Sequence, residues 1–278
     1  MDTLKILAPA LFGLAVLLVA FAVYSVLCLT GRTPQVAGME RRKFGDGFGP
    51  YLTRYMYWVI GPIERMLLAS NVSPNAITGL SLLACAGAGI AIGTGHLAAM
   101  TWLYALAGTL DLLDGRLARA TGRSSAAGAL FDSVADRWGE LFVLSGCVWY
   151  LRDSDWLASA LVAIAGSLMV SYTRARGEGL GLQLDGGAMQ RAERMVLTSL
   201  GALIAAMLAV SPSTDDYVMA AVGSALLLVG VASSATALGR WLAGYRELLA
   251  RDAGPKVVRP APAPEPAANM RITGEHTA

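Results

Sequence analysis

Four aspartates lie at fixed spacings in the segment 111–137, beside stretches that are otherwise apolar. Asp111 and Asp114 are three residues apart, and Asp132 and Asp136 are four residues apart. At these spacings each pair shares one face of a helix, and the short connection between the two helices lets the pairs converge. Converging carboxylates repel one another in a low-dielectric setting unless cations neutralise them, which indicates a divalent metal site.

The ligand type indicates which metal would bind. Carboxylate oxygens favour hard ions such as Mg²⁺ or Mn²⁺ over zinc, and no histidine or cysteine lies close to the aspartates in sequence. The alternative is that the aspartates only form ion pairs with nearby arginines at a membrane interface. Those arginines are Arg116, Arg119, Arg123 and Arg137. We favour the metal site, because ionisable residues in membrane segments are by default functional.

Small residues accompany the aspartates. Gly115, Ala118 and Gly128 would let a bulky ligand approach the backbone. Arg119 would be a cationic partner for a diphosphate. Close packing of membrane helices also uses small residues, so the glycines alone would favour packing. Together with the carboxylates and Arg119, they favour a nucleotide site.

The elements that position these residues are apolar segments long enough to cross a bilayer. Of the 278 residues, 55% are apolar and only 15% are charged, whereas about 25% are charged in an average soluble domain. Because a spanning helix needs roughly 20 apolar residues, we expect an all-α integral membrane protein with seven spans. These lie near 4–29, 75–95, 97–117, 129–151, 155–173, 195–211 and 216–239.

The placement of charge indicates how the chain is oriented. Of the 22 lysines and arginines, only Lys5 and Arg152 face the outside if four segments are cytoplasmic. Those segments are 31–73, 118–128, 174–194 and the chain from Arg240 onward. Under the positive-inside rule we expect a multi-pass inner-membrane protein with its N-terminus outside, its C-terminus inside and the aspartates on the cytoplasmic side. A formal net charge of +2 does not indicate a nucleic-acid partner.

The chain divides into four expected parts. They are an N-terminal transmembrane helix (1–30), an interfacial amphipathic segment (31–72), a membrane domain (73–243) and a cytoplasmic tail (244–278). The first helix has no small-residue cleavage pattern, so we interpret it as retained rather than as a signal peptide. The second segment mixes aromatic, aliphatic and charged residues, with an ordinary loop as the alternative. The tail contains PAPAPEP and is expected to be disordered from residue 255.

The aspartates and small residues together form the pattern D-x2-D-G-x2-A-R-x8-G-x3-D-x3-D. This pattern resembles the signature of the CDP-alcohol phosphatidyltransferase family at every fixed position, so a chance match is very improbable. The residues that carry it are Asp111, Asp114, Gly115, Ala118, Arg119, Gly128, Asp132 and Asp136. The resemblance extends from about Ser73 to Ala243. It implies a six-helix membrane bundle, usually a homodimer, to which the span at 4–29 is an addition.

The resemblance implies an enzyme that moves a phosphatidyl group from CDP-diacylglycerol to an alcohol and releases CMP. Asp111, Asp114 and Asp132, with help from Asp136, would hold two Mg²⁺ or Mn²⁺ ions that clamp the diphosphate. Asp136 would also be the catalytic base that takes the proton from the attacking hydroxyl. Further residues would bind the CDP-lipid: Asn75, Thr78, Gly115, Ala118, Arg119, Ser125 and Gly128.

A second polar cluster, SYTRARGEGLGLQLDGGAMQRAERM, points to the acceptor. Arginine binds phosphate through bidentate hydrogen bonds, so a phosphorylated polyol bound by Arg174, Arg191 and Arg194 fits better than free serine, choline or ethanolamine. For Arg176 and Arg191, contact with lipid headgroups is a nearly equal alternative to binding the acceptor. The cluster resembles the branch of the family that uses inositol phosphate. The glycerol 3-phosphate branch is the alternative.

Two other functions could use some of these features. Intramembrane prenyltransferases also hold a diphosphate on aspartate-bound Mg²⁺, but their aspartate spacing usually differs and they lack the D-G-x2-A-R continuation. A transporter would account for seven spans and small-residue packing. Its polar residues should lie near the bilayer midplane between broken helices, whereas the aspartates gather at one membrane face.

Overall fold

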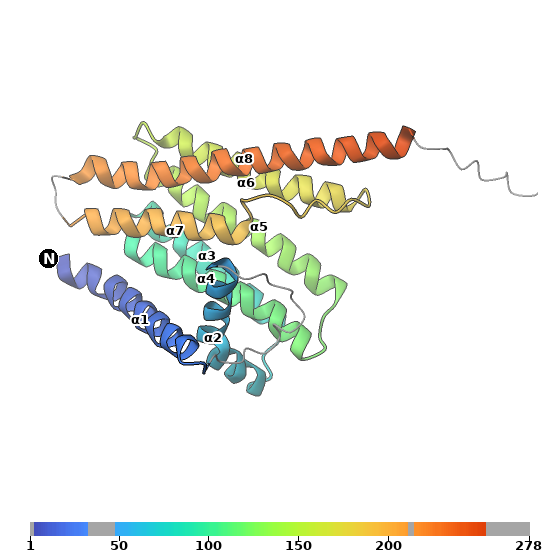
Figure 1. The fold of residues 1–278 in the computed structure, drawn as a ribbon. Coiled ribbons are helices and arrows are strands. Elements are labelled where there is room, and N and C mark those ends of the chain that lie inside the picture. The colour runs from blue at the N-terminus through green and yellow to red at the C-terminus, as the bar shows by residue number, and fades with distance from the viewer. Residues whose placement is uncertain (1–2, 33–47, 211–213, 254–278) are drawn as a thin grey trace, which may run out of the picture.

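The computed structural model describes residues 3–32, 48–210 and 214–253, and within these ranges the chain forms eight helices and no strand (Figure 1). The helices are α1 (Thr3–Leu29), α2 (Phe48–Ala69), α3 (Pro74–Gly93), α4 (Leu97–Ala120), α5 (Ala126–Tyr150), α6 (Leu157–Glu178), α7 (Arg191–Leu208) and α8 (Asp215–Ala253). Each expected span coincides with one of the helices α1 and α3 to α8. The expected all-α fold is therefore confirmed.

Four of the described helices are long and apolar enough to cross a membrane. They are Leu11–Leu29 of α1, and α3, α6 and α8. The other three expected spans, α4, α5 and α7, carry the four aspartates, Arg191 and Arg194 and are not among these four helices. The apolar helices α6 and α8 also contribute site residues, namely Arg174 and Arg240.

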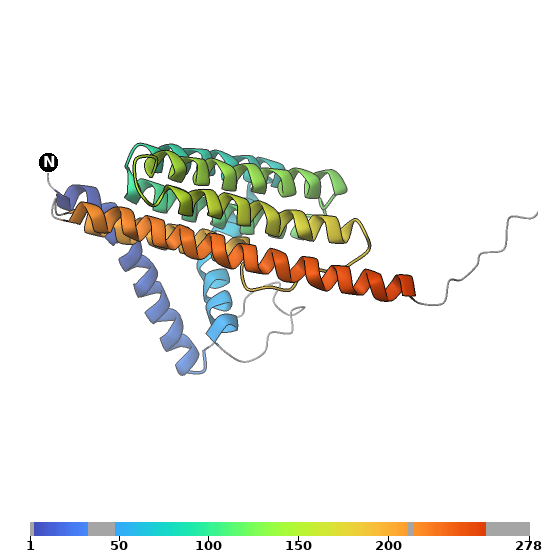
Figure 2. The ribbon, with the colours of Figure 1, turned by 90° about the horizontal axis from the view of Figure 1, so that it is seen from above.

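The bundle from α3 to α8 is held together by close helix contacts. Helix α3 packs against α4 and α5, α6 packs against α8, and α7 lies between α4 and α8 (Figures 1 and 2). A Cβ atom on Gly146 of α5 would lie 2.1 Å from the carbonyl oxygen of Gly89 in α3, so only glycine permits this approach. Buried apolar side chains such as Met100, Val143 and Leu226 fill the interior between these helices. The helices that carry the site residues are therefore closely packed against one another.

Helices α1 and α2 lie on one side of the bundle (Figure 2). Phe21 of α1 makes edge-on ring contacts with Tyr51 and Tyr55 of α2, at centroid distances of 5.9 and 5.1 Å. Helix α2 is joined to α4 by a bidentate ion pair in which Arg116 donates to Glu64 at 2.9 and 2.7 Å. The helix expected in the second half of the segment 31–72 is thus present, and it is tied to the helix that carries two of the aspartates.

Helix α8 is the longest element, with 39 residues. Its C-terminal part extends beyond the ends of the neighbouring helices (Figure 1). The tail from residue 255, for which we expect disorder, lies outside the described residues.

Candidate active site

The aspartates are positioned by the end of α4 and the start of α5. Helix α4 ends at Ala120 and α5 begins at Ala126. Ser125 is the N-cap of α5, since its hydroxyl oxygen accepts a 3.0 Å hydrogen bond from the backbone N–H of Gly128. The five-residue connection turns the chain back, so the two helices present their carboxylates at the same end of the bundle. The sequence-based expectation that the pairs converge holds in the structure.

Three carboxylates form one group. Asp111, Asp114 and Asp132 each offer an oxygen, and these three oxygens all lie within 4.8 Å of one another. We call these three residues the carboxylate group. Asp114 is buried and accepts a 2.6 Å hydrogen bond from the hydroxyl of Thr78 in α3. Three helices therefore fix the positions of these side chains.

The carboxylate group suits a hard divalent cation. Oδ1 of Asp132 is buried and has no hydrogen-bond partner among the described residues. A buried carboxylate oxygen without a partner is costly, and a metal ion would satisfy it. Oxygen donors at this spacing match the preference of Mg²⁺ or Mn²⁺ rather than that of zinc. The residues present thus fit the metal that the sequence predicts.

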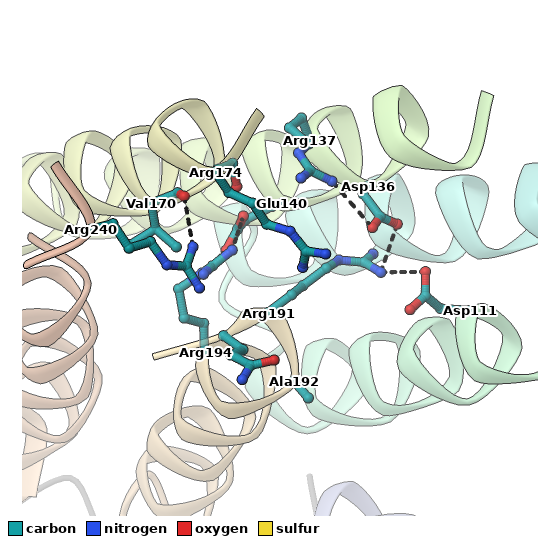
Figure 3. A pocket seen from close by; sticks show the side chains of 12 residues that line it. Asp111, Asp136, Arg137, Glu140, Val170, Arg174, Arg191, Ala192, Arg194 and Arg240 are labelled. Atoms are coloured by element: carbon teal, nitrogen blue, oxygen red, sulfur yellow. Dashed lines mark hydrogen bonds and ion pairs between the residues drawn. The ribbon is translucent and has the colours of Figure 1, made fainter. Parts of the chain in front are cut away.

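Asp136 lies beside the carboxylate group rather than within it. Its Oδ1 is 2.7 Å from Nη1 of Arg191, the first residue of α7, and the same nitrogen forms an ion pair with Oδ1 of Asp111 (Figure 3). Its Oδ2 lies 3.4 Å from Nη1 of Arg137. The Arg191 guanidinium therefore bridges one aspartate of α4 and one of α5.

A cavity of 290 Å³ opens next to Asp136. Helices α4 to α8 all contribute to its wall, which includes acidic side chains (Asp111, Asp136 and Glu140) and five arginines (Figure 3). The arginines are Arg137, Arg174, Arg191, Arg194 and Arg240. We call it the arginine cavity. A surplus of guanidinium groups makes it suited to a small anion such as a phosphate monoester.

Two of these arginines are buried and donate to backbone carbonyls. Arg194, with only 3% of its side chain exposed, donates to both carboxylate oxygens of Glu140 at 2.5 and 2.9 Å and to the carbonyl of Met189 at 3.2 Å. Arg240 is also buried and donates to the carbonyls of Gly186 and Val170 at 2.8 and 2.9 Å. These contacts join α8, α6 and the loop before α7 into one wall.

Arg174 is held more loosely. It forms ion pairs with Glu178 at 2.9 Å and Asp185 at 3.2 Å, and about half of its side chain is exposed. The structure thus brings all three arginines predicted for the acceptor, Arg174, Arg191 and Arg194, to the same cavity. Their partners differ, because Arg191 contacts the aspartates whereas Arg174 and Arg194 pair with other acids.

The residues predicted to bind the CDP-lipid gather at the same end of the bundle as the aspartates. A Cβ atom on Gly128 would lie 3.1 Å from Oγ of Ser125 and 3.5 Å from Oδ1 of Asn75. A Cβ on Gly115 would lie 3.3 Å from Nη1 of Arg119, so the guanidinium lies over the glycine. Ala118 is half-buried, one turn after Asp114. The two glycines therefore let the polar side chains of Arg119, Ser125 and Asn75 lie close to the backbone at this end of the bundle.

Arg240 and Glu140 are the site residues that the sequence reasoning missed. Glu140 lies within the apolar span 129–151, and Arg240 was assigned only to the start of the cytoplasmic segment. A charged residue inside a span was the available signal for Glu140. No local pattern indicated that Arg240 folds back onto the cavity, because its partners, Val170 and Gly186, are far away in the sequence.

The fold and the site define a class of protein: a membrane-embedded enzyme in which a carboxylate group suited to a divalent metal adjoins an arginine-lined cavity. Sequence comparison narrows the class, since residues 71–236 match the CDP-alcohol phosphatidyltransferase family. The chain belongs to this family. The predicted family and the predicted class of enzyme are therefore confirmed.

Characterised relatives share both sequence and fold. The phosphatidylinositol phosphate synthase of Mycobacterium marinum is 33% identical over 162 residues, which cover 55% of this chain and 68% of that protein. The phosphatidylinositol phosphate synthase of Mycobacterium tuberculosis has been solved with CDP-DAG bound (TM-score 0.58, 30% identity, 66% of this chain and 92% of that one). Its complex with manganese and citrate gives a TM-score of 0.59 at 29% identity, covering 66% and 88% of the two chains.

Proposed function

We propose that this enzyme transfers the phosphatidyl group of CDP-diacylglycerol to a hydroxyl of inositol phosphate and releases CMP. The observation that carries the proposal is the carboxylate group directly beside the arginine cavity, since Asp111 belongs to both. Support comes from the relatives named as phosphatidylinositol phosphate synthases and from the related structure with CDP-DAG bound.

The carboxylate group forms the donor side of the proposed site. Asp111, Asp114 and Asp132, with help from Asp136, would hold two Mg²⁺ or Mn²⁺ ions, which would neutralise the diphosphate and the departing CMP. Thr78 orients the Asp114 carboxylate through its 2.6 Å hydrogen bond. The CDP moiety would lie along a surface of small and polar residues at this end of the bundle: Asn75, Thr78, Gly115, Ala118, Arg119, Ser125 and Gly128.

Asp136 is the proposed catalytic base. It borders the arginine cavity, so an acceptor bound there would present its hydroxyl to this carboxylate. As the hydroxyl oxygen bonds to the phosphorus of the phosphatidyl group, Asp136 takes the hydroxyl proton. The bond between that phosphorus and the CMP oxygen breaks, and CMP leaves with the electron pair. Without metal, Arg137 and Arg191 hold the Asp136 carboxylate at the edge of the cavity.

The arginine cavity forms the acceptor side. Arg174 and Arg191 would donate to the phosphate of the acceptor, since their present partners are carboxylates that a phosphate can replace. Arg194 and Arg240 contribute positive charge and a fixed wall, because their donors are largely engaged by Glu140 and by backbone carbonyls. A free polyol without phosphate carries no anionic group that could replace the carboxylate partners of Arg174 and Arg191.

We also propose how the enzyme lies in its membrane. The positive-inside distribution supports an inner-membrane location with the active site on the cytoplasmic side, the N-terminus outside and the C-terminus inside. Residues 1–30 would add one span to the membrane domain 73–243, α2 would lie at the interface within 31–72, and 244–278 would be cytoplasmic. By analogy with the family, the enzyme would be a homodimer.

The test is CMP release by the purified protein with CDP-diacylglycerol and Mg²⁺ or Mn²⁺. Inositol phosphate, glycerol 3-phosphate, inositol and serine would be compared as acceptors. We expect release with inositol phosphate only, and its loss on chelation. Release with glycerol 3-phosphate instead would refute the proposed acceptor while keeping the reaction, and release with inositol or serine would refute the role of the arginine cavity.

A further inference from the structure

Arg191 lies between the carboxylate group and the arginine cavity. Its Nη1 forms ion pairs with Asp111 and Asp136, yet its side chain also lines the arginine cavity (Figure 3). The side chain is only 17% exposed, and its Nε is buried without a hydrogen-bond partner among the described residues. The guanidinium is therefore bound on one edge and has a free donor on another.

Asp111 is shared between Arg191 and the carboxylate group. The oxygen atoms of Asp111 face both the guanidinium and the neighbouring aspartates Asp114 and Asp132. Arg191 supplies a single positive charge to a site with four carboxyl groups. Divalent ions at the same carboxylates would supply that charge more completely and would repel the guanidinium. Metal binding therefore weakens the contact between Arg191 and Asp111, and that contact weakens metal binding.

Arg191 is better placed to move than the other buried arginines of the cavity. Arg194 and Arg240 donate to backbone carbonyls, which cannot be displaced without moving the chain. The described partners of Arg191 are side-chain carboxylates, and it is the first residue of α7. A change of its side-chain rotamer would turn the guanidinium from the aspartates into the cavity that it already lines.

We propose that Arg191 competes with the metal for Asp111 and Asp136, and that metal loading frees its guanidinium to bind the phosphate of the acceptor. The second half of this statement rests on the proposed function; the first half does not. Because binding linkage is reciprocal, metal and acceptor then strengthen each other's binding through Arg191. Arg191 thus favours acceptor binding only when the metal is bound.

The first test measures Mn²⁺ affinity of the purified full-length protein without lipid or acceptor, from the free-Mn²⁺ electron paramagnetic resonance signal. Arg191→Gln should bind Mn²⁺ at least about fivefold more tightly than the wild type, a modest coupling on the usual scale. The matched control is Arg174→Gln, which removes the same charge from the same cavity, but at a residue paired with Glu178 and Asp185 rather than with Asp111 and Asp136. It should change the affinity less than about twofold. Arg191→Lys, which keeps the charge, should stay closer to the wild type than Arg191→Gln.

The second test repeats the titration with saturating inositol phosphate. In the wild type the acceptor should tighten Mn²⁺ binding about fivefold, and in Arg191→Gln most of this gain should vanish. Two results of the titration without acceptor would overturn the competition. One is unchanged or weaker Mn²⁺ binding by a well-folded Arg191→Gln protein. The other is an increase in Mn²⁺ affinity in Arg174→Gln as large as that in Arg191→Gln. If CMP release fails with every acceptor, the proposed reaction is refuted, but the Mn²⁺ shift without acceptor still tests the competition by itself.

Discussion

The carboxylate group and the arginine cavity are neighbours, but the protein supports them in opposite ways. In the carboxylate group, Asp132 has a buried oxygen without a described partner, and Asp114 accepts a hydrogen bond from the hydroxyl of Thr78. In the arginine cavity, Arg194 is held by both oxygens of Glu140 and by a carbonyl. Like charges with few partners favour an incoming cation, whereas a buried and satisfied pair fixes shape. The carboxylate group is thus suited to take up a cation, whereas the buried part of the arginine cavity has a fixed shape.

The largest effect on turnover should come from Asp136→Asn. The substitution removes the proposed base but keeps the size of the side chain, so kcat should fall about 10²- to 10⁴-fold. The carboxylate group retains its three aspartates, and binding of CDP-diacylglycerol should remain close to that of the wild type. Turnover is measured as CMP release, and binding as retention of labelled CDP-lipid. Normal turnover in this variant would remove Asp136 from the chemistry.

Arg194→Met should lower stability more than any other single change in the arginine cavity. The substitution leaves Glu140 buried without its partner, which costs about 3 to 5 kcal/mol of unfolding free energy. Thermal unfolding of the detergent-solubilised protein would show the loss as a lower midpoint temperature.

A double variant and an exposed arginine are the controls for this prediction. Replacing both members, Glu140→Leu with Arg194→Met, should recover most of the stability, because no charge is then left unpaired. Arg174→Met, at a side chain that is 47% exposed, should cost less than about 1 kcal/mol. If Arg194→Met were as stable as Arg174→Met, the contrast between the two regions would be wrong.

The smallest of these effects should follow Thr78→Val. The change removes the hydroxyl that orients Asp114, and the loss of such a supporting hydrogen bond should weaken Mn²⁺ binding or turnover about 10- to 100-fold. Thr78→Ser keeps the hydroxyl and should retain most of the affinity. Ser81→Ala is the matched control on the same helix, since the Ser81 hydroxyl donates to the carbonyl of Ala107 at 2.9 Å rather than to an aspartate. Equal losses in Thr78→Val and Ser81→Ala would indicate general damage to α3.

The carboxylate group could be predicted from the sequence because it depends on local geometry. Asp111 and Asp114 lie on one helix and Asp132 lies on the next, so helical spacing and one short turn are enough to bring the three side chains together. Thr78 was expected near the nucleotide through the family resemblance. Its hydrogen bond to Asp114 required the packing of α3 against α4, which spacing along the chain does not reveal.

The arginine cavity was less predictable because its contacts link distant parts of the chain. Arg194 pairs with Glu140, 54 residues away, and Arg240 donates to Val170, 70 residues away. The sequence indicated that Arg194 and Arg191 are basic residues near an acceptor. It could not indicate that one is bound by a glutamate and the other by the metal-site aspartates. That distinction depends on how α7 meets α4 and α5 in three dimensions.

The length of α8 has a consequence for the loop that follows α6. At 1.5 Å per residue its 39 residues reach about 58 Å, nearly twice the roughly 30 Å of bilayer hydrocarbon. Arg240, which walls the arginine cavity, is followed by about 20 Å of further helix. This last part of α8 packs against that loop: Arg251 donates to the carbonyl of Gly181 at 3.2 Å, and a Cβ atom on Gly244 would lie 3.2 Å from the side chains of Leu182 and Leu184. The extension of α8 therefore braces the loop whose Gly186 carbonyl holds Arg240 at the cavity, so shortening α8 after Arg240 would loosen that loop.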